Sequence, residues 1–119
     1  MPLVWRDPIN ENSTATVETQ IRDENGDALA KTSIDSVTMT IETRKGTAIV
    51  TDVDVLDKVS ASGLFSRLFT TSENAIVDDD ARDRSFETHI VTLVIVTNDS
   101  PAKTLTETIW LSIKNVKAS

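Results

Sequence analysis

A two-residue alternation runs through the last part of the chain, from residue 104 to residue 113. One set of alternate positions is mostly aliphatic, with Leu105, Ile109, Leu111 and Ile113, and the other holds Thr104, Thr106, Thr108, Trp110 and Ser112. This period is typical of a β-strand with one buried face. No stretch of twelve or more residues shows the 3.6-residue apolar period of an amphipathic helix. Seventeen Thr, 12 Val and 10 Ile among 119 residues add strong β propensity, so we expect an all-β chain.

Similar patterns predict five further strands. They cover residues 14–22, 34–43, 48–56, 64–69 and 86–97. Strands that follow one another at 10–15-residue spacing, without helical segments between them, predict an antiparallel two-sheet Ig-like sandwich of six to seven strands. Residues 86–97 are apolar on both faces, which predicts a central strand buried on both sides.

The length of the chain is that of one domain, and its first residues differ from the rest. We expect residues 1–13 to form an N-terminal arm and residues 14–119 to form the sandwich. Pro2 and Pro8 lack backbone donors, so the arm is not expected to join a sheet. So much apolar surface predicts that the arm docks either on its own domain or on a neighbour, and we favour a partner, bound by Leu3, Val4, Trp5 and Ile9.

Composition excludes several classes of function. The chain has no Cys, one His and three Gly, which excludes disulfides, thiol nucleophiles and a glycine-rich phosphate loop, and opposes a zinc site. A net charge of −7 opposes binding to nucleic acid or to an anionic membrane. The chain shows no basic leader before an apolar stretch and no apolar run long enough to span a bilayer, so we expect synthesis in a cytoplasm. We expect no cofactor.

Two polar features are candidates for chemistry. His89 lies between Glu87 and Val91 on one strand face, and we expect a half-exposed histidine beside a carboxylate rather than a catalytic base, because a catalytic site needs several convergent groups. The acidic segment of Asp78, Asp79, Asp80 and Asp83 is a candidate cation site. The alternative, which we favour, is a solvated loop partly neutralised by neighbouring arginines. We therefore expect no metal and no enzyme activity.

Trp110 shares its strand face with threonines, and an exposed tryptophan in such a setting is typical of an anchor for a partner protein or a carbohydrate ring. Two alternatives remain at this point. Trp110 could pack into the core, or the N-terminal arm could cover it.

Three stretches carry a resemblance to a known class. They are RDENGDA at residues 22–28 with IDSVTMTI at 34–41, SGLFSRLFT at 62–70, and the closing pair ETHIVTLVIVT and LTETIWLSIKNV. Their order over about residues 14–116 resembles small Ig-like β-sandwich proteins and domains of tailed-bacteriophage virions. The resemblance implies a non-enzymatic role in the virion, cementing a capsid, lining a neck or attaching a tail appendage.

The same resemblance implies other virion structural proteins as partners, in a symmetric multi-copy assembly, after synthesis in a host cytoplasm. A carbohydrate- or receptor-binding domain is the alternative, with Trp110 as the stacking platform. Five aromatic residues in the whole chain weaken that alternative. An enzyme is a further rival, which the single histidine disfavours.

We predict that the melting temperature does not depend on calcium. A site that binds calcium in the folded state alone would add about 2.7 kcal/mol at a hundredfold excess over Kd. Melting curves with calcium and with a chelator test this prediction. A calcium-dependent rise that disappears when Asp78, Asp79 and Asp80 are changed to Asn would contradict it.

Overall fold

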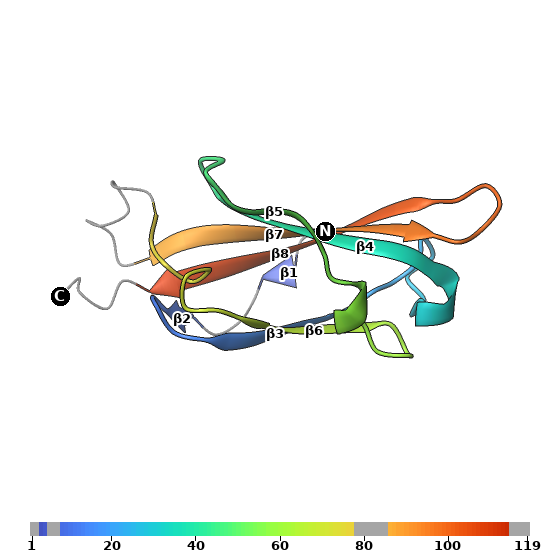
Figure 1. Ribbon diagram of the computed structural model, residues 1–119, viewed down its shortest axis with the longest axis horizontal. Coiled ribbons are helices and arrows are strands. Elements are labelled where there is room, and N and C mark those ends of the chain that lie inside the picture. Colours follow the sequence, from blue (N-terminus) through green and yellow to red (C-terminus); the bar gives the residue numbers. More distant parts are fainter. Residues whose placement is uncertain (1–2, 5–7, 78–85, 115–119) are drawn as a thin grey trace.

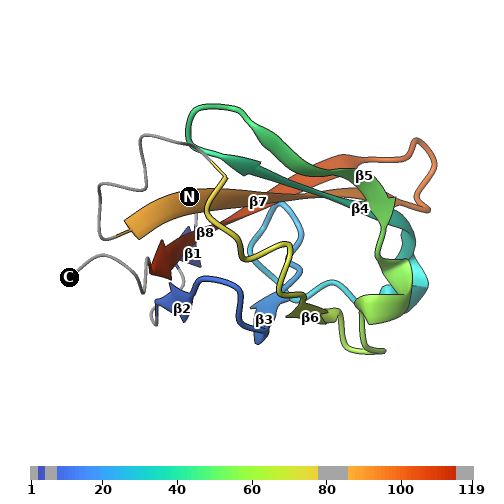
Figure 2. The ribbon, with the colours of Figure 1, turned by 60° about the vertical axis from the view of Figure 1, so that its left-hand side comes forward.

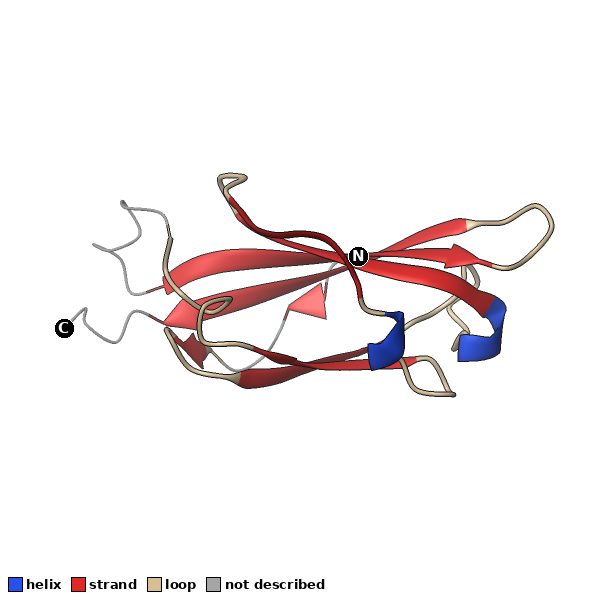
Figure 3. Ribbon diagram, viewed as in Figure 1, coloured by secondary structure: helices blue, strands red, loops and turns tan. Residues whose placement is uncertain are grey.

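Six long strands and two short ones make up the chain in the computed structural model, which describes residues 3–4, 8–77 and 86–114. The strands are β1 (Leu3–Val4), β2 (Ile9–Asn10), β3 (Ala15–Gln20), β4 (Ile34–Thr43), β5 (Ala48–Asp54), β6 (Leu64–Phe69), β7 (Phe86–Thr97) and β8 (Thr104–Lys114). Two single turns of 3-10 helix, η1 (Lys31–Ser33) and η2 (Leu56–Lys58), complete the elements (Figure 3). The all-β expectation is confirmed, and each of the six expected strands is present.

The strands form two layers (Figures 1 and 2). The large sheet has six strands in the order β1-β8-β7-β4-β5, with β2 also paired to β8, and the small sheet pairs β3 with β6. All pairs among β4, β5, β7 and β8 are antiparallel, as is the β3–β6 pair, but β1 and β2 run parallel to β8. The expectation of a wholly antiparallel structure is therefore wrong, because the N-terminal segment runs along β8 in the same direction.

Residues 3–4 and 9–10 pair with β8, whereas we expected the N-terminal arm to stay outside the sheets. Leu3 is opposite Ile109, and Ile9 is opposite Ile113, so the segment extends the large sheet of its own chain. Ile9 is 5% exposed and belongs to the core. Pro8 directly precedes β2, a position at the start of an edge strand where a missing donor is tolerated. Pro8 therefore does not prevent the pairing of β2 with β8.

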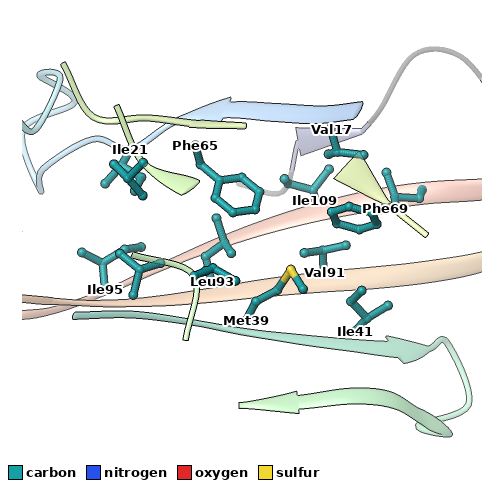
Figure 4. Packing of buried hydrophobic residues seen from close by; sticks show 14 of the residues in the cluster. Val17, Ile21, Met39, Ile41, Phe65, Phe69, Val91, Leu93, Ile95 and Ile109 are labelled. Atoms are coloured by element: carbon teal, nitrogen blue, oxygen red, sulfur yellow. The ribbon is translucent and has the colours of Figure 1, made fainter. Parts of the chain in front are cut away.

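The core fills the space between the two sheets (Figure 4). Its fully buried members include Val17, Ile21, Phe65 and Phe69 from the small-sheet layer, and Met39, Ile41, Val91, Leu93, Ile95, Ile109 and Leu111 from the large sheet. These residues occupy alternate positions of their strands, as the period of two requires. The inward set expected for residues 34–43, with Val37, Met39 and Ile41, is confirmed.

The longest strand, β7, is central in the large sheet, between β4 and β8, as we expected. The expectation that both of its faces are buried is wrong. Val91 is fully buried, whereas Ile90, Val94 and Val96 on the opposite face are half-buried. The small sheet covers one face of β7, and no layer covers the other within residues 8–77 and 86–114.

Strand β5 forms one edge of the large sheet and carries features that oppose pairing with another strand. Asp52 has a positive φ of 48°, and the β4–β5 register shifts twice along the pair. Asp52 and Asp54 are both exposed. Irregular backbone and charge protect an edge against strand addition, so this edge is guarded.

We predict that Ile109→Ala lowers the free energy of unfolding by about 2–5 kcal/mol, because Ile109 is fully buried between the sheets. Thr108→Ala, one residue away on the opposite face, should cost less than about 1 kcal/mol. Urea unfolding of both variants tests the difference. Equal losses would show that the face assignment of β8 is wrong.

Candidate interaction surface

The face of the large sheet that points away from the core is the candidate site, and we call it the outer face. It consists of the outward positions of three strands: Ser36, Thr38, Thr40 and Glu42 on β4; Phe86, Thr88, Ile90, Thr92, Val94 and Val96 on β7; and Thr104, Thr106, Thr108, Trp110, Ser112 and Lys114 on β8. Every one of these side chains is exposed or half-buried. The outer face is therefore open over the described part of the chain.

An aromatic group lies at one end of the outer face. Trp110 is directly opposite Ile90, and Phe86 is opposite Lys114. Phe86 is 45% exposed, and Trp110 is half-buried. The guanidinium carbon of Arg44 lies 5.9 Å from the centre of the Trp110 ring, within cation–π range. We call Phe86, Ile90, Trp110 and Arg44 the aromatic end.

The local backbone explains how Arg44 reaches Trp110. Arg44 directly follows β4, and its N–H donates to the carbonyl of Thr88 on β7 at 3.2 Å. The following turn is closed by the N–H of Gly46, which donates to the carbonyl of Thr43 at 2.9 Å, with Gly46 at a φ of 94°. A residue with a side chain is strained at that φ, so glycine at this position holds Arg44 at the end of the hairpin.

The remainder of the outer face is rich in hydroxyl groups and poor in charge. Glu42 and Lys114 are the charged residues among its positions, whereas 26% of the whole chain is charged. At the β5 edge, the hydroxyl of Thr40 donates to Asp52 Oδ1 at 3.2 Å. Depletion of charge together with Trp, Phe and Arg at the surface is typical of protein–protein interfaces.

The residues that we predicted to bind a partner do not form one surface in the structure. Trp110 lies on the outer face, which excludes the alternative in which it packs into the core. Leu3 and Val4 extend the sheet beside β8, and the backbone of Val4 is opposite Trp110. Ile9 is a core residue, which corrects its assignment as a partner contact. Trp5 lies outside the described residues.

The sequence analysis missed Arg44, Ile90 and Phe86. The alternation of residues 86–97 predicted that Ile90 and Val91 lie on opposite faces of the strand. The same period assigns Phe86 to the face of Ile90. The association of Arg44 with Trp110 depends on the register across three strands, which no local pattern contains.

His89 and Glu87 form a buried pair on the inner face of β7. His89 Nε2 lies 2.7 Å from Glu87 Oε1, and the two side chains are 0% and 4% exposed. The same carboxylate oxygen accepts the N–H of Val77 at 3.1 Å. The expectation that His89 is half-exposed is therefore wrong, because His89 lies at an inward position of β7 and is buried in the core. A pair this deeply buried presents no group to a substrate.

A second ion pair fastens the connection after β6. Arg67 donates to both oxygens of Glu73, at 2.8 and 2.9 Å, and the N–H of Thr70 donates to Glu73 Oε1 at 2.8 Å. Burial alone would raise the pKa of Glu73, but the hydrogen bonds from Arg67 and Thr70 and the positive charge of Arg67 outweigh it, so the pKa lies below its ordinary value of 4.5.

We predict that Glu73→Gln destabilises the fold at pH 7 and that this difference shrinks in acid. The folded-state pKa of Glu73 lies below its unfolded value, so its contribution is complete above pH 4.5 and is lost as the pH falls through the folded pKa. Urea unfolding from about pH 7 to about pH 3 measures the difference. Glu18→Gln, at an exposed position of β3, is the control. A difference that stays constant with pH would contradict the assignment.

Three further observations concern metal binding, membrane spans and similarity to known proteins. Within the described ranges, no three His, Cys, Asp or Glu side chains are grouped so that they could hold a metal ion, and the acidic segment Asp78, Asp79, Asp80 and Asp83 lies outside those ranges. No helix in the described part of the chain is long and apolar enough to cross a membrane. Comparisons of the chain with family models, with curated proteins and with solved structures find no match.

Proposed function

We propose that the chain is a non-enzymatic structural module of a phage-like virion that binds neighbouring virion proteins through its outer face. The support for the virion is the resemblance of residues 14–116 to Ig-like domains of tailed-bacteriophage particles. The support for binding is the composition and geometry of the outer face. These two supports are independent of each other.

The strand order favours an Ig-like sandwich as the underlying fold. In such sandwiches strands C, F and G share one sheet, C′ can extend it, and B and E belong to the other sheet. Here β4, β7 and β8 take the places of C, F and G, β5 that of C′, and β3 and β6 those of B and E. Among residues 3–4, 8–77 and 86–114, the small sheet has no strands flanking β3 and β6, and β1 and β2 pair with β8.

The aromatic end is the observation that carries the proposal. Trp110 lies beside Ile90 and within 5.9 Å of the Arg44 guanidinium, and exposed Phe86 lies on the same face at the start of β7. Trp and Arg dominate the residues that contribute most to protein–protein binding, and they are most effective within a patch that excludes water. The uncharged threonines around this group can be covered without removing many charges from water.

The positions of His89 and Arg44 also count against the two alternative functions, an enzyme and a carbohydrate-binding domain. The one histidine of the chain is fully buried and hydrogen-bonded to Glu87, so it is not available as a general base at the surface. Arg44 lies over the Trp110 ring at 5.9 Å, and a sugar stacking on that ring face would first have to displace the guanidinium. A carbohydrate platform is therefore the less favoured function.

We predict that Trp110→Ala reduces the occupancy of the protein in purified virions. Truncation of a central Trp at an interface costs at least about 2 kcal/mol, which corresponds to roughly a thirtyfold loss of affinity. Quantitative mass spectrometry of density-purified particles, produced with each variant in place of the wild type, measures the occupancy.

Leu68→Ala is the matched control, because Leu68 is 56% exposed but lies on β6 in the other layer. Retained occupancy of the Leu68 variant together with loss of the Trp110 variant supports the proposal. Full occupancy of the Trp110 variant, with an unchanged melting curve, would exclude the outer face as the contact. Specific binding to a glycan array that depends on Trp110 would favour the carbohydrate function instead.

A further inference from the structure

We infer that the first partner of the outer face is a second copy of this chain, bound face to face about a two-fold axis. This inference rests on the proposed function, since it names the partner of the same surface. Three properties of the described residues carry it: the size of the outer face, the distribution of charge over it, and the protection of the β5 edge.

The outer face is large enough for a stable dimer. The three strands of the outer face, β4, β7 and β8, and the adjacent edge strand β5 lie side by side, and we count the exposed side of β5 as part of the contact. At about 4.8 Å between strands and about 3.3 Å per residue, four strands of about ten residues cover roughly 600–700 Å². Standard interfaces bury about 600–1,000 Å² on each partner. A single face-to-face contact therefore reaches the standard size without any rearrangement.

The charge of the chain restricts where two copies can meet. With a net charge of −7, two copies repel each other over most of their surfaces. The outer face with its β5 edge is the exception, because Glu42, Asp52 and Asp54 are nearly balanced there by Arg44 and Lys114. Two copies can therefore approach through this face without bringing many acidic side chains together.

Opposite charges also lie in different parts of the same region. Arg44 and Lys114 lie at the aromatic end, whereas exposed Asp52 and Asp54 line the β5 edge. In a two-fold contact, residue i of one copy meets residue j of the other, and residue j meets residue i. In such a contact the cationic part of each copy can meet the acidic part of the other, so the same favourable charge pairing forms twice.

The edge of the sheet offers a poorer route to self-association. Pairing through β5 would need a regular ladder, but Asp52 has a φ of 48° and the β4–β5 register shifts twice. Asp52 and Asp54 of two copies would also meet along such a ladder. A face-to-face contact through the outer face needs no such ladder.

Sedimentation equilibrium of the purified chain over a range of concentrations tests the inference. We expect the mass to rise from 13.0 kDa toward twice that value with increasing concentration. Val94→Lys lies on the outer face of β7, opposite Thr38 and Thr106, and should weaken the dimer at least tenfold by burying like charges of two copies in the contact.

Thr16→Lys is the matched control. It makes the same change in net charge at an exposed position of β3, in the other layer, and should leave the dimer unchanged. If Val94→Lys does not fold, as judged by circular dichroism, Thr106→Lys takes its place, because Thr106 is exposed on the same face. A wild-type mass of 13.0 kDa at all concentrations up to about 1 mM would overturn the inference. So would equal association of the outer-face and β3 variants.

The outcome is distinguishable from a failure of the proposed function. A monomeric wild type whose Trp110→Ala variant is still lost from virions would remove the self-contact and keep the virion contact. A dimer that Val94→Lys disrupts, with full virion occupancy of Trp110→Ala, would keep the self-contact and remove the proposed virion contact.

Discussion

The register of β7 between β4 and β8 determines which side chains of the large sheet meet the core. Val91 is opposite Ile41 on one side and Ile109 on the other, so three fully buried residues form one row across the sheet. A shift of one residue would turn each of them to the solvent, because side chains alternate between faces. The same register places Ile90 beside Trp110 on the outer face. The core and the candidate surface are therefore two consequences of one set of strand pairings.

Local patterns in the sequence predicted the strands well and the N-terminal segment poorly. The expected strands 34–43 and 86–97 coincide with β4 and β7, because each is long and its period is clear. The pairing of β1 and β2 with β8 joins opposite ends of the chain through two-residue contacts, which leave no periodic signal. Ile9 was misassigned for that reason, since only its tertiary contacts bury it. Trp110 was placed on the outward side by alternation, but its contact with Arg44 depends on cross-strand geometry.

Polar contacts hold the connection after β6 against the starts of β3 and β7, and Phe86 of the outer face lies at the start of β7. Glu73 fastens the connection after β6 through Arg67, and Asn74 donates to the carbonyl of Ser13 at 2.7 Å, just before β3. Glu87 then accepts the N–H of Val77, so the connection is also tied to the start of β7. Phe86 precedes Glu87 and points outward from the strand start that this contact holds. The buried network thus anchors the backbone next to Phe86, which lowers the backbone entropy that binding must remove.

The threonines of the outer face reconcile two opposing demands on such a protein. A sheet face that binds partners needs strand-forming residues and little charge, but a wide apolar face would cause aggregation before assembly. Threonine has the β-branched shape that favours strands and a hydroxyl that water can solvate. Around Trp110, the half-buried Thr108 and Ser112 allow the face to remain hydrated in the free chain. The apolar contribution to binding is then concentrated at the aromatic end, while the net charge of −7 opposes contact through the rest of the surface.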